Sequence, residues 1–150
     1  MSNTYFFILI ALIAGVLVPA QGAANNRMAM VVDSPVLAAF ISFMIGTLAL
    51  FVYLLLAGIP PWNLSAAREA PAIAWSGGLM GAFFVAASVA LIPRLGVAMT
   101  FSLIIAGQMA ATLAIDHFGL FGVEVRPINL PKVVGILLIT AGVILVRRFQ

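Results

Sequence analysis

The sequence predicts an all-α membrane protein with five transmembrane helices. Hydrophobic residues make up 65% of the chain and charged residues only 7%, and the mean hydropathy is +1.25. A soluble domain carries roughly 25% charged residues, so this chain lacks the polar side chains that a water-facing surface requires. Five apolar stretches, each long enough to cross a bilayer, are separated by short segments that hold most of the charges. We therefore expect one domain over residues 1–150.

The first predicted span covers residues 4–24 and ends in polar residues. Pro19 lies inside it and removes one backbone hydrogen bond from the helix. Gln21 and Asn25 follow, and their spacing of four places them on one helical face. Two interpretations stay open: these residues cap a helix that enters water, or they form a wall of a polar cavity within the membrane.

We expect the first span to be retained, because no Lys or Arg precedes Arg27 and a signal peptide begins with basic residues. A short turn is predicted over residues 26–33. Ser34 and Pro35 then suit the start of a second span over residues 36–57, since Ser is a good N-cap and Pro fits the first helical turn.

The second span is almost featureless. Ser42 and Gly46 form a small-xxx-small pair, which is more typical of a packing seam between helices than of a binding site.

The third predicted span covers residues 71–92. Gly77 and Gly81 form a G-x-x-x-G pair, which permits close contact with a neighbouring helix. Trp75 and Ser88 are candidates to line a site, with packing against lipid or protein as the alternative for each.

The fourth predicted span, residues 97–116, carries a polar stripe. Gln108, Thr112 and Asp116 recur at intervals of four and so lie along one side of the helix. An amide at the depth of Gln108 needs a hydrogen-bonding partner, because lipid offers none. That partner is either another helix or a bound ligand, and the residues leave both open.

The fourth span ends in Asp116 and His117, the latter being the only histidine of the chain. One interpretation is an ion pair at the membrane interface with Arg94, Arg126 or lipid headgroups. The other is a role in ion or proton coupling, because a histidine and an intramembrane acid can relay protons.

The fifth predicted span covers residues 131–146. Pro131 suits the first turn of this helix. Gly135 and Gly142 lie on one face, where their small size favours close packing against another helix.

The distribution of basic residues gives only a weak preference for one orientation of the chain in the membrane. With five spans the termini lie on opposite sides, and the basic side chains divide almost evenly. Three lie on one side (Arg68, Arg126, Lys132) and four on the other (Arg27, Arg94, Arg147, Arg148). The positive-inside rule is therefore nearly balanced. Such a balance fits a chain inserted in both orientations and paired antiparallel, and it also fits one orientation set by few charges.

Five helices are few for a transport cavity. Many transporters are built from inverted repeats around a site near the midplane of the membrane. We expect this chain to supply one half and a second copy of itself, or a separate homologous chain, to supply the other.

Several short motifs occur along the chain: Ser34-Pro35, Pro93-Arg-Leu-Gly96, Ala106-Gly-Gln108, Ile115-Asp-His-Phe-Gly-Leu-Phe-Gly122 and the Gly135–Val143 helix. Together these motifs resemble the YdcZ-like family of the drug/metabolite transporter superfamily, which is related to EamA-type and small multidrug-resistance transporters. The resemblance covers nearly the whole chain.

The resemblance implies a multi-pass protein of the bacterial inner membrane that moves a small organic solute by alternating access. It also implies five-span halves, with dual topology and an antiparallel dimer in some members. One departure matters: small multidrug-resistance proteins carry a glutamate in their first helix, whereas the first span here has no acid. Proton coupling and binding of cationic drugs are therefore not implied.

The predicted solute-binding residues are mostly uncharged polar side chains: Gln21, Asn25, Trp75, Ser88 and Gln108. They suit a neutral or zwitterionic polar solute, or an aromatic one stacked on Trp75. Asp116 and His117 are assigned to ion coupling or an interfacial ion pair. The residues assigned to helix packing are Gly77, Gly81, Gly135 and Gly142.

We expect no cofactor, no metal site and no enzymatic activity, because one histidine, four acids and no cysteine leave no recognisable catalytic set. The expected partners are the lipid bilayer, a second half in the opposite orientation and the solute, and not a nucleic acid. A passive channel and a structural or regulatory membrane subunit without transport are the alternatives.

Overall fold

The computed structural model describes the backbone of residues 2–149 and the side chains of residues 4–60 and 65–149. The described residues form four α-helices and three short 3₁₀ segments: α1 (Ser2–Val32), α2 (Pro35–Leu56), η1 (Pro61–Glu69), η2 (Ala72–Trp75), α3 (Ser76–Phe118), η3 (Leu120–Gly122) and α4 (Leu130–Arg148). They divide into two compact units, Met1–Pro93 and Arg94–Gln150. The prediction of an all-α membrane protein agrees with this architecture.

The first helix is longer than predicted, and the expected turn over residues 26–33 is wrong. Residues 26–32 continue α1 because they contain no Gly or Pro and include Ala and Met, which favour helix. The reversal is confined to Asp33, whose φ is 52°, and Ser34.

The predicted start of the second helix is confirmed. Ser34 caps α2, since its side chain accepts a hydrogen bond of 3.2 Å from the backbone N–H of Leu37, and Pro35 follows in the first turn. This cap fixes the point at which the chain turns back on α1.

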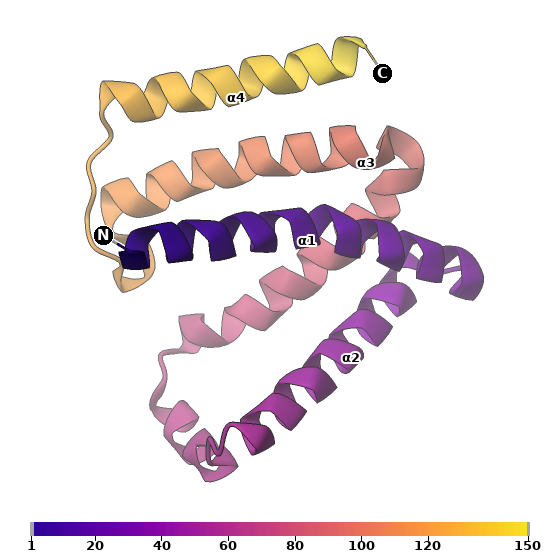
Figure 1. The fold of residues 1–150 in the computed structure, drawn as a ribbon, viewed down its shortest axis with the longest axis vertical. Coiled ribbons are helices and arrows are strands. Elements are labelled where there is room, and N and C mark those ends of the chain that lie inside the picture. Colours follow the sequence, from indigo (N-terminus) through magenta and orange to yellow (C-terminus); the bar gives the residue numbers. More distant parts are fainter. Residues whose placement is uncertain (1, 150) are drawn as a thin grey trace. The chain divides into compact units, whose positions relative to one another are not determined.

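Within the first unit, α1 and α2 meet at this turn and splay apart toward their other ends (Figure 1). A small apolar core joins them to the first part of α3 through Ala29, Ala39, Val85 and Val89. Gly81 of α3 lies against the ring of Phe43, so that an added Cβ would stand 3.3 Å from its Cζ.

The third helix begins later than predicted. Pro71 is extended, residues 72–75 form η2, and α3 starts only at Ser76. Its single break lies at Gly96, where φ is 73° and ψ is 164°. L-residues rarely adopt this backbone conformation, which explains the glycine.

The structure does not confirm five spans. Among the residues that the structure describes, four helical stretches are long and apolar enough to cross a membrane, because the third and fourth predicted spans lie in one stretch, Ala72–Phe118. The boundary between the two units, after Pro93, falls within that stretch, and the break at Gly96 lies just beyond it in the second unit.

In the second unit, the part of α3 after Gly96 and α4 run antiparallel and are joined by a loop (Figure 1). The loop leaves α3 through Gly119, whose φ is 60° and where a Cβ would meet Val125 Cγ2 at 2.7 Å. The helix α4 is capped by Asn129, whose Oδ1 accepts a hydrogen bond of 3.1 Å from the N–H of Lys132.

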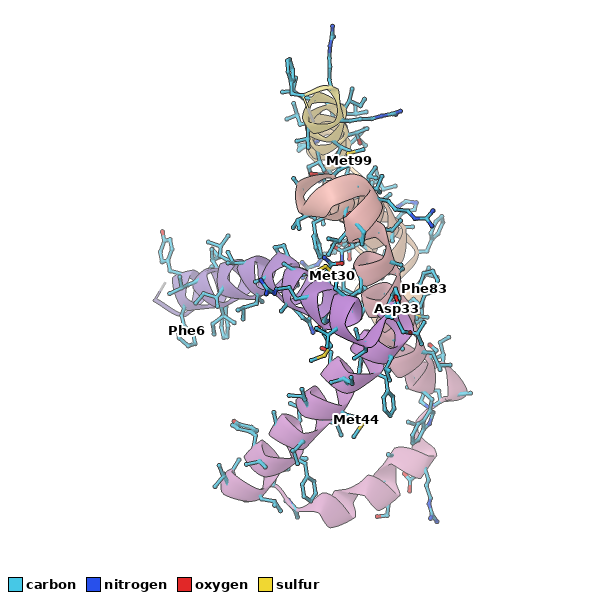
Figure 2. All side chains as sticks on the ribbon, turned by 90° about the vertical axis from the view of Figure 1, so that its right-hand side faces the viewer. Phe6, Met30, Asp33, Met44, Phe83 and Met99 are labelled. Atoms are coloured by element: carbon cyan, nitrogen blue, oxygen red, sulfur yellow. The ribbon has the colours of Figure 1, made fainter. Side chains whose placement is uncertain are left out.

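Large apolar side chains cover the outside of the helices. In the most apolar 18-residue stretch of each of α1, α2 and α4, only 6% of the residues are buried inside the chain. Figure 2 shows Phe6 and Met44 projecting from α1 and α2 into open space, and they are 60% and 57% exposed. In water such surfaces would aggregate, whereas in a bilayer they face acyl chains.

Candidate functional site

Two adjacent hollows lie between α1 and α2, and together we call them the α1–α2 groove. Their volumes are about 180 and 210 Å³, and Ser42 lines both. The hollow nearer the turn is lined by Ala24, Asn25, Met28, Ala38, Ile41, Ser42 and Ile45. The other is lined by Gln21, Ser42, Phe43, Gly46, Thr47 and Leu50. The groove follows from the splay of the two helices.

Asn25 is the most unusual residue of this groove. It is 8% exposed, and its Nδ2 is fully buried with no hydrogen-bond partner among the described residues. An unsatisfied buried amide costs about 1–3 kcal/mol. The described part of the chain leaves this cost uncompensated.

Gln21 lies one helical turn before Asn25 and lines the second hollow. The structure thus brings both predicted residues of α1 to one groove. Ser42 and Thr47 of α2 lie opposite them. The sequence did not predict their position in the groove, because a small hydroxyl residue near glycine is equally typical of a packing seam.

Two other predicted residues of this unit do not line the α1–α2 groove. Trp75, at the end of η2, is 62% exposed. Ser88 is buried, and its hydroxyl donates a hydrogen bond of 2.9 Å to the carbonyl of Val85 in its own helix. The polarity of Ser88 is therefore satisfied locally.

A second groove of about 240 Å³, the α3–α4 groove, lies within the second unit. Its lining is mainly apolar, with one acid and one lysine: Met109, Thr112, Leu113, Asp116, Lys132, Gly135, Ile136 and Ile139. Gln108 is exposed and does not line this groove. Its backbone carbonyl accepts a hydrogen bond of 2.8 Å from the Thr112 hydroxyl.

Asp116 is paired with a residue that the sequence did not suggest. Lys132 Nζ lies 3.8 Å from Asp116 Oδ2, and both side chains are about one-third exposed. Arg126, one of the expected partners, pairs with Glu124 instead at 3.1 Å. The pairing with Lys132 depends on where the loop returns the chain, which no local spacing encodes.

His117 anchors the same loop. Its Nδ1 accepts a hydrogen bond of 3.3 Å from the N–H of Ile128, and its ring stands edge-on to Phe118 with centroids 4.8 Å apart. The carbonyl of Asp116 accepts a further bond of 2.8 Å from the N–H of Arg126. In this arrangement both residues hold the end of α3 to the loop.

The glycines assigned to helix packing divide into two groups. Gly81 has a neighbour in Phe43, as described above. At Gly77, Gly135 and Gly142, by contrast, an added Cβ would meet no described atom within 4 Å. These three positions leave backbone open to whatever covers the helices from outside.

Comparison with known protein families identifies the group to which this chain is related. Residues 6–145 match the model of the family described as "Putative inner membrane exporter, YdcZ". The chain belongs to the YdcZ family. This confirms the family expected from the motifs, and it places the chain in the inner membrane.

Membership in the YdcZ family, together with the membrane-spanning helices, supports a membrane transporter and argues against an enzyme. No curated protein and no solved structure was found to match the chain. Membership in the YdcZ family therefore indicates a class of function, and the solute and its binding site have to be inferred from the residues of this chain.

The contacts of Lys132 yield a first prediction for this YdcZ protein. Its ammonium also donates to the carbonyls of Arg126 and Pro127, at 3.1 and 3.4 Å. Lys132→Met removes these bonds together with the pair to Asp116, so we expect a loss of about 1–2 kcal/mol of stability. A fall of several degrees in the thermal midpoint in detergent would show it.

Arg27→Met is the matched control, since it removes one exposed basic side chain of α1. Equal midpoints for the two variants would show that Lys132 does not hold the loop.

Proposed function

We propose that the chain is one half of an exporter, a five-span subunit that moves a small organic solute by alternating access as an antiparallel pair. The second half is a copy of the chain or a homologous one in the opposite orientation. The family description supports export, and the helices support a membrane transporter.

The length of the stretch Ala72–Phe118 supports five spans. It has 47 residues, which is about 70 Å of helix at 1.5 Å per residue. The hydrocarbon core is only about 30 Å thick. The non-helical backbone of Gly96 lies near the middle of this stretch, so we propose that it crosses the membrane twice.

The observation that carries the proposal is the set of polar side chains that line the α1–α2 groove in helices that are otherwise apolar. Gln21, Asn25, Ser42 and Thr47 line it, and lipid cannot satisfy their hydrogen-bonding groups. Polar residues within membrane helices typically face a cavity or another helix. A groove of this kind is one wall of a solute pathway.

The open glycines support a second half. A helix with an exposed small residue allows another backbone to approach closely. Gly77, Gly135 and Gly142 provide such positions, and within the described chain nothing fills them. Inverted halves around a central site would cover these faces and close the groove.

Flux through the purified protein in proteoliposomes tests the proposal. We expect exchange of a labelled uncharged solute that saturates with concentration, as for a carrier. Ohmic single-channel current would instead indicate a pore. Absence of both from a correctly assembled protein would indicate a structural or regulatory subunit and would contradict the proposal.

A further inference from the structure

We infer that the α1–α2 groove is a solute subsite for an uncharged molecule with an apolar body, whose hydrogen-bond acceptor is held by the side-chain amide of Asn25. This inference rests on the proposed function and goes beyond it by naming the chemical class of the solute. It is narrower than the sequence prediction, since it leaves out zwitterions and stacking on Trp75.

The hydrogen-bond acceptor on the solute is inferred from the buried, unpaired side-chain amide of Asn25. The residue is more than nine-tenths buried, it lines the groove, and its Nδ2 donates to no described atom. The adjacent Ser42 adds a hydroxyl that can donate or accept. A carbonyl, ether or hydroxyl oxygen placed in the groove would satisfy this donor once rotation of the Asn25 side chain turns Nδ2 toward the groove.

That the solute is uncharged follows from the residues that line the two hollows. None of the residues that line either hollow is acidic or basic. An ionised group brought into an apolar site without a charged partner loses its hydration with little compensation. The charged residues nearest in sequence to Asn25 are Arg27 and Asp33, which line neither hollow.

The apolar body and its size follow from the remaining side chains. Met28, Ile41, Ile45, Phe43 and Leu50 form most of the surface around the polar groups. The hollows of about 180 and 210 Å³ are smaller than the roughly 300–1,000 Å³ of pockets for drug-sized ligands. The subsite therefore suits a small molecule, or one end of a larger one.

The test uses three probes of nearly the same shape and different charge: phenylacetamide, phenylacetate and phenylethylammonium. The full-length protein is ¹⁵N-labelled and reconstituted in lipid nanodiscs, and the side-chain NH₂ signals of asparagine are followed by NMR. We expect phenylacetamide to shift the Asn25 signal with saturation, and the two charged probes to leave it in place.

Two matched variants separate binding from folding. Asn25→Leu removes the donor together with its NMR signal, so binding to this variant is followed by the backbone amide signal of Ser42. We expect phenylacetamide to bind it at least about tenfold more weakly. Because Nδ2 has no partner within the described chain, the same change should not lower the thermal midpoint. Asn26→Leu, at the neighbouring position outside the groove, should keep binding unchanged.

Several outcomes would overturn the inference. These are unchanged binding in Asn25→Leu, equal binding of the charged probes, or a marked loss of stability in Asn25→Leu, which would show that the amide serves the fold through water or a partner subunit. Equal flux through Asn25→Leu and the parent would contradict the subsite at Asn25, while the proposal that the chain is a transporter would stand. Saturable binding at Asn25 without flux would support the subsite and contradict the transporter.

Discussion

Replacing Gly96 with alanine is expected to abolish assembly of the folded protein. The backbone of Gly96 has φ 73° and ψ 164°, a region that is essentially restricted to glycine. A side chain there costs about 1–3 kcal/mol, and the alternative is an unbroken helix. At 43 residues, α3 would then be about 65 Å long, twice the thickness of the hydrocarbon core.

The measurement is the yield of monodisperse protein after extraction and its thermal midpoint. Gly107→Ala is the control, because this glycine is helical and an added Cβ meets no described atom within 4 Å. It should behave as the parent or slightly better. A Gly96→Ala protein that assembles and melts like the parent would show that the break in α3 is not required.

Replacing Gln108 with alanine is expected to reduce transport at least about tenfold while the protein stays folded. Gln108 is exposed on an apolar helix, and no described residue hydrogen-bonds its side-chain amide. In the proposed pair this amide faces the second half or the solute. Loss of a hydrogen bond at such a site lowers the affinity for the bound partner roughly tenfold or more.

Initial rates of solute exchange in proteoliposomes check this prediction, with size-exclusion profiles to confirm assembly. Thr112→Val is the control, because the Thr112 hydroxyl is already satisfied by the carbonyl of Gln108. Parent rates in a correctly assembled Gln108→Ala protein would remove Gln108 from the site.

Local sequence signals predicted the parts of the fold that local physics decides. The cap at Ser34 with Pro35, and the start of the last helix near Pro131, were readable because each involves residues within one turn. The grouping of Gln21 and Asn25 followed from helical periodicity alone. Apolar composition predicted the membrane-spanning helices.

What the sequence could not show are contacts between distant segments. The pair of Asp116 with Lys132 depends on the path of an entire loop, and the hydroxyls of Ser42 and Thr47 gain their position only from the splay of α1 and α2. The end of α1 was misplaced because Asn25 and Asn26 suggested a helix terminus, whereas the residues after them continue the helix. Trp75 was assigned to the site on residue type alone.

The central claim is that this chain is half of a transporter and is completed by an inverted counterpart. Its most direct test fuses the C-terminus to a reporter that is active only inside the inner membrane and, separately, to one active only outside. For a chain that transports solute when purified alone, we predict signal from both reporters at comparable levels. Signal from one side only, with transport intact, would contradict the antiparallel pair.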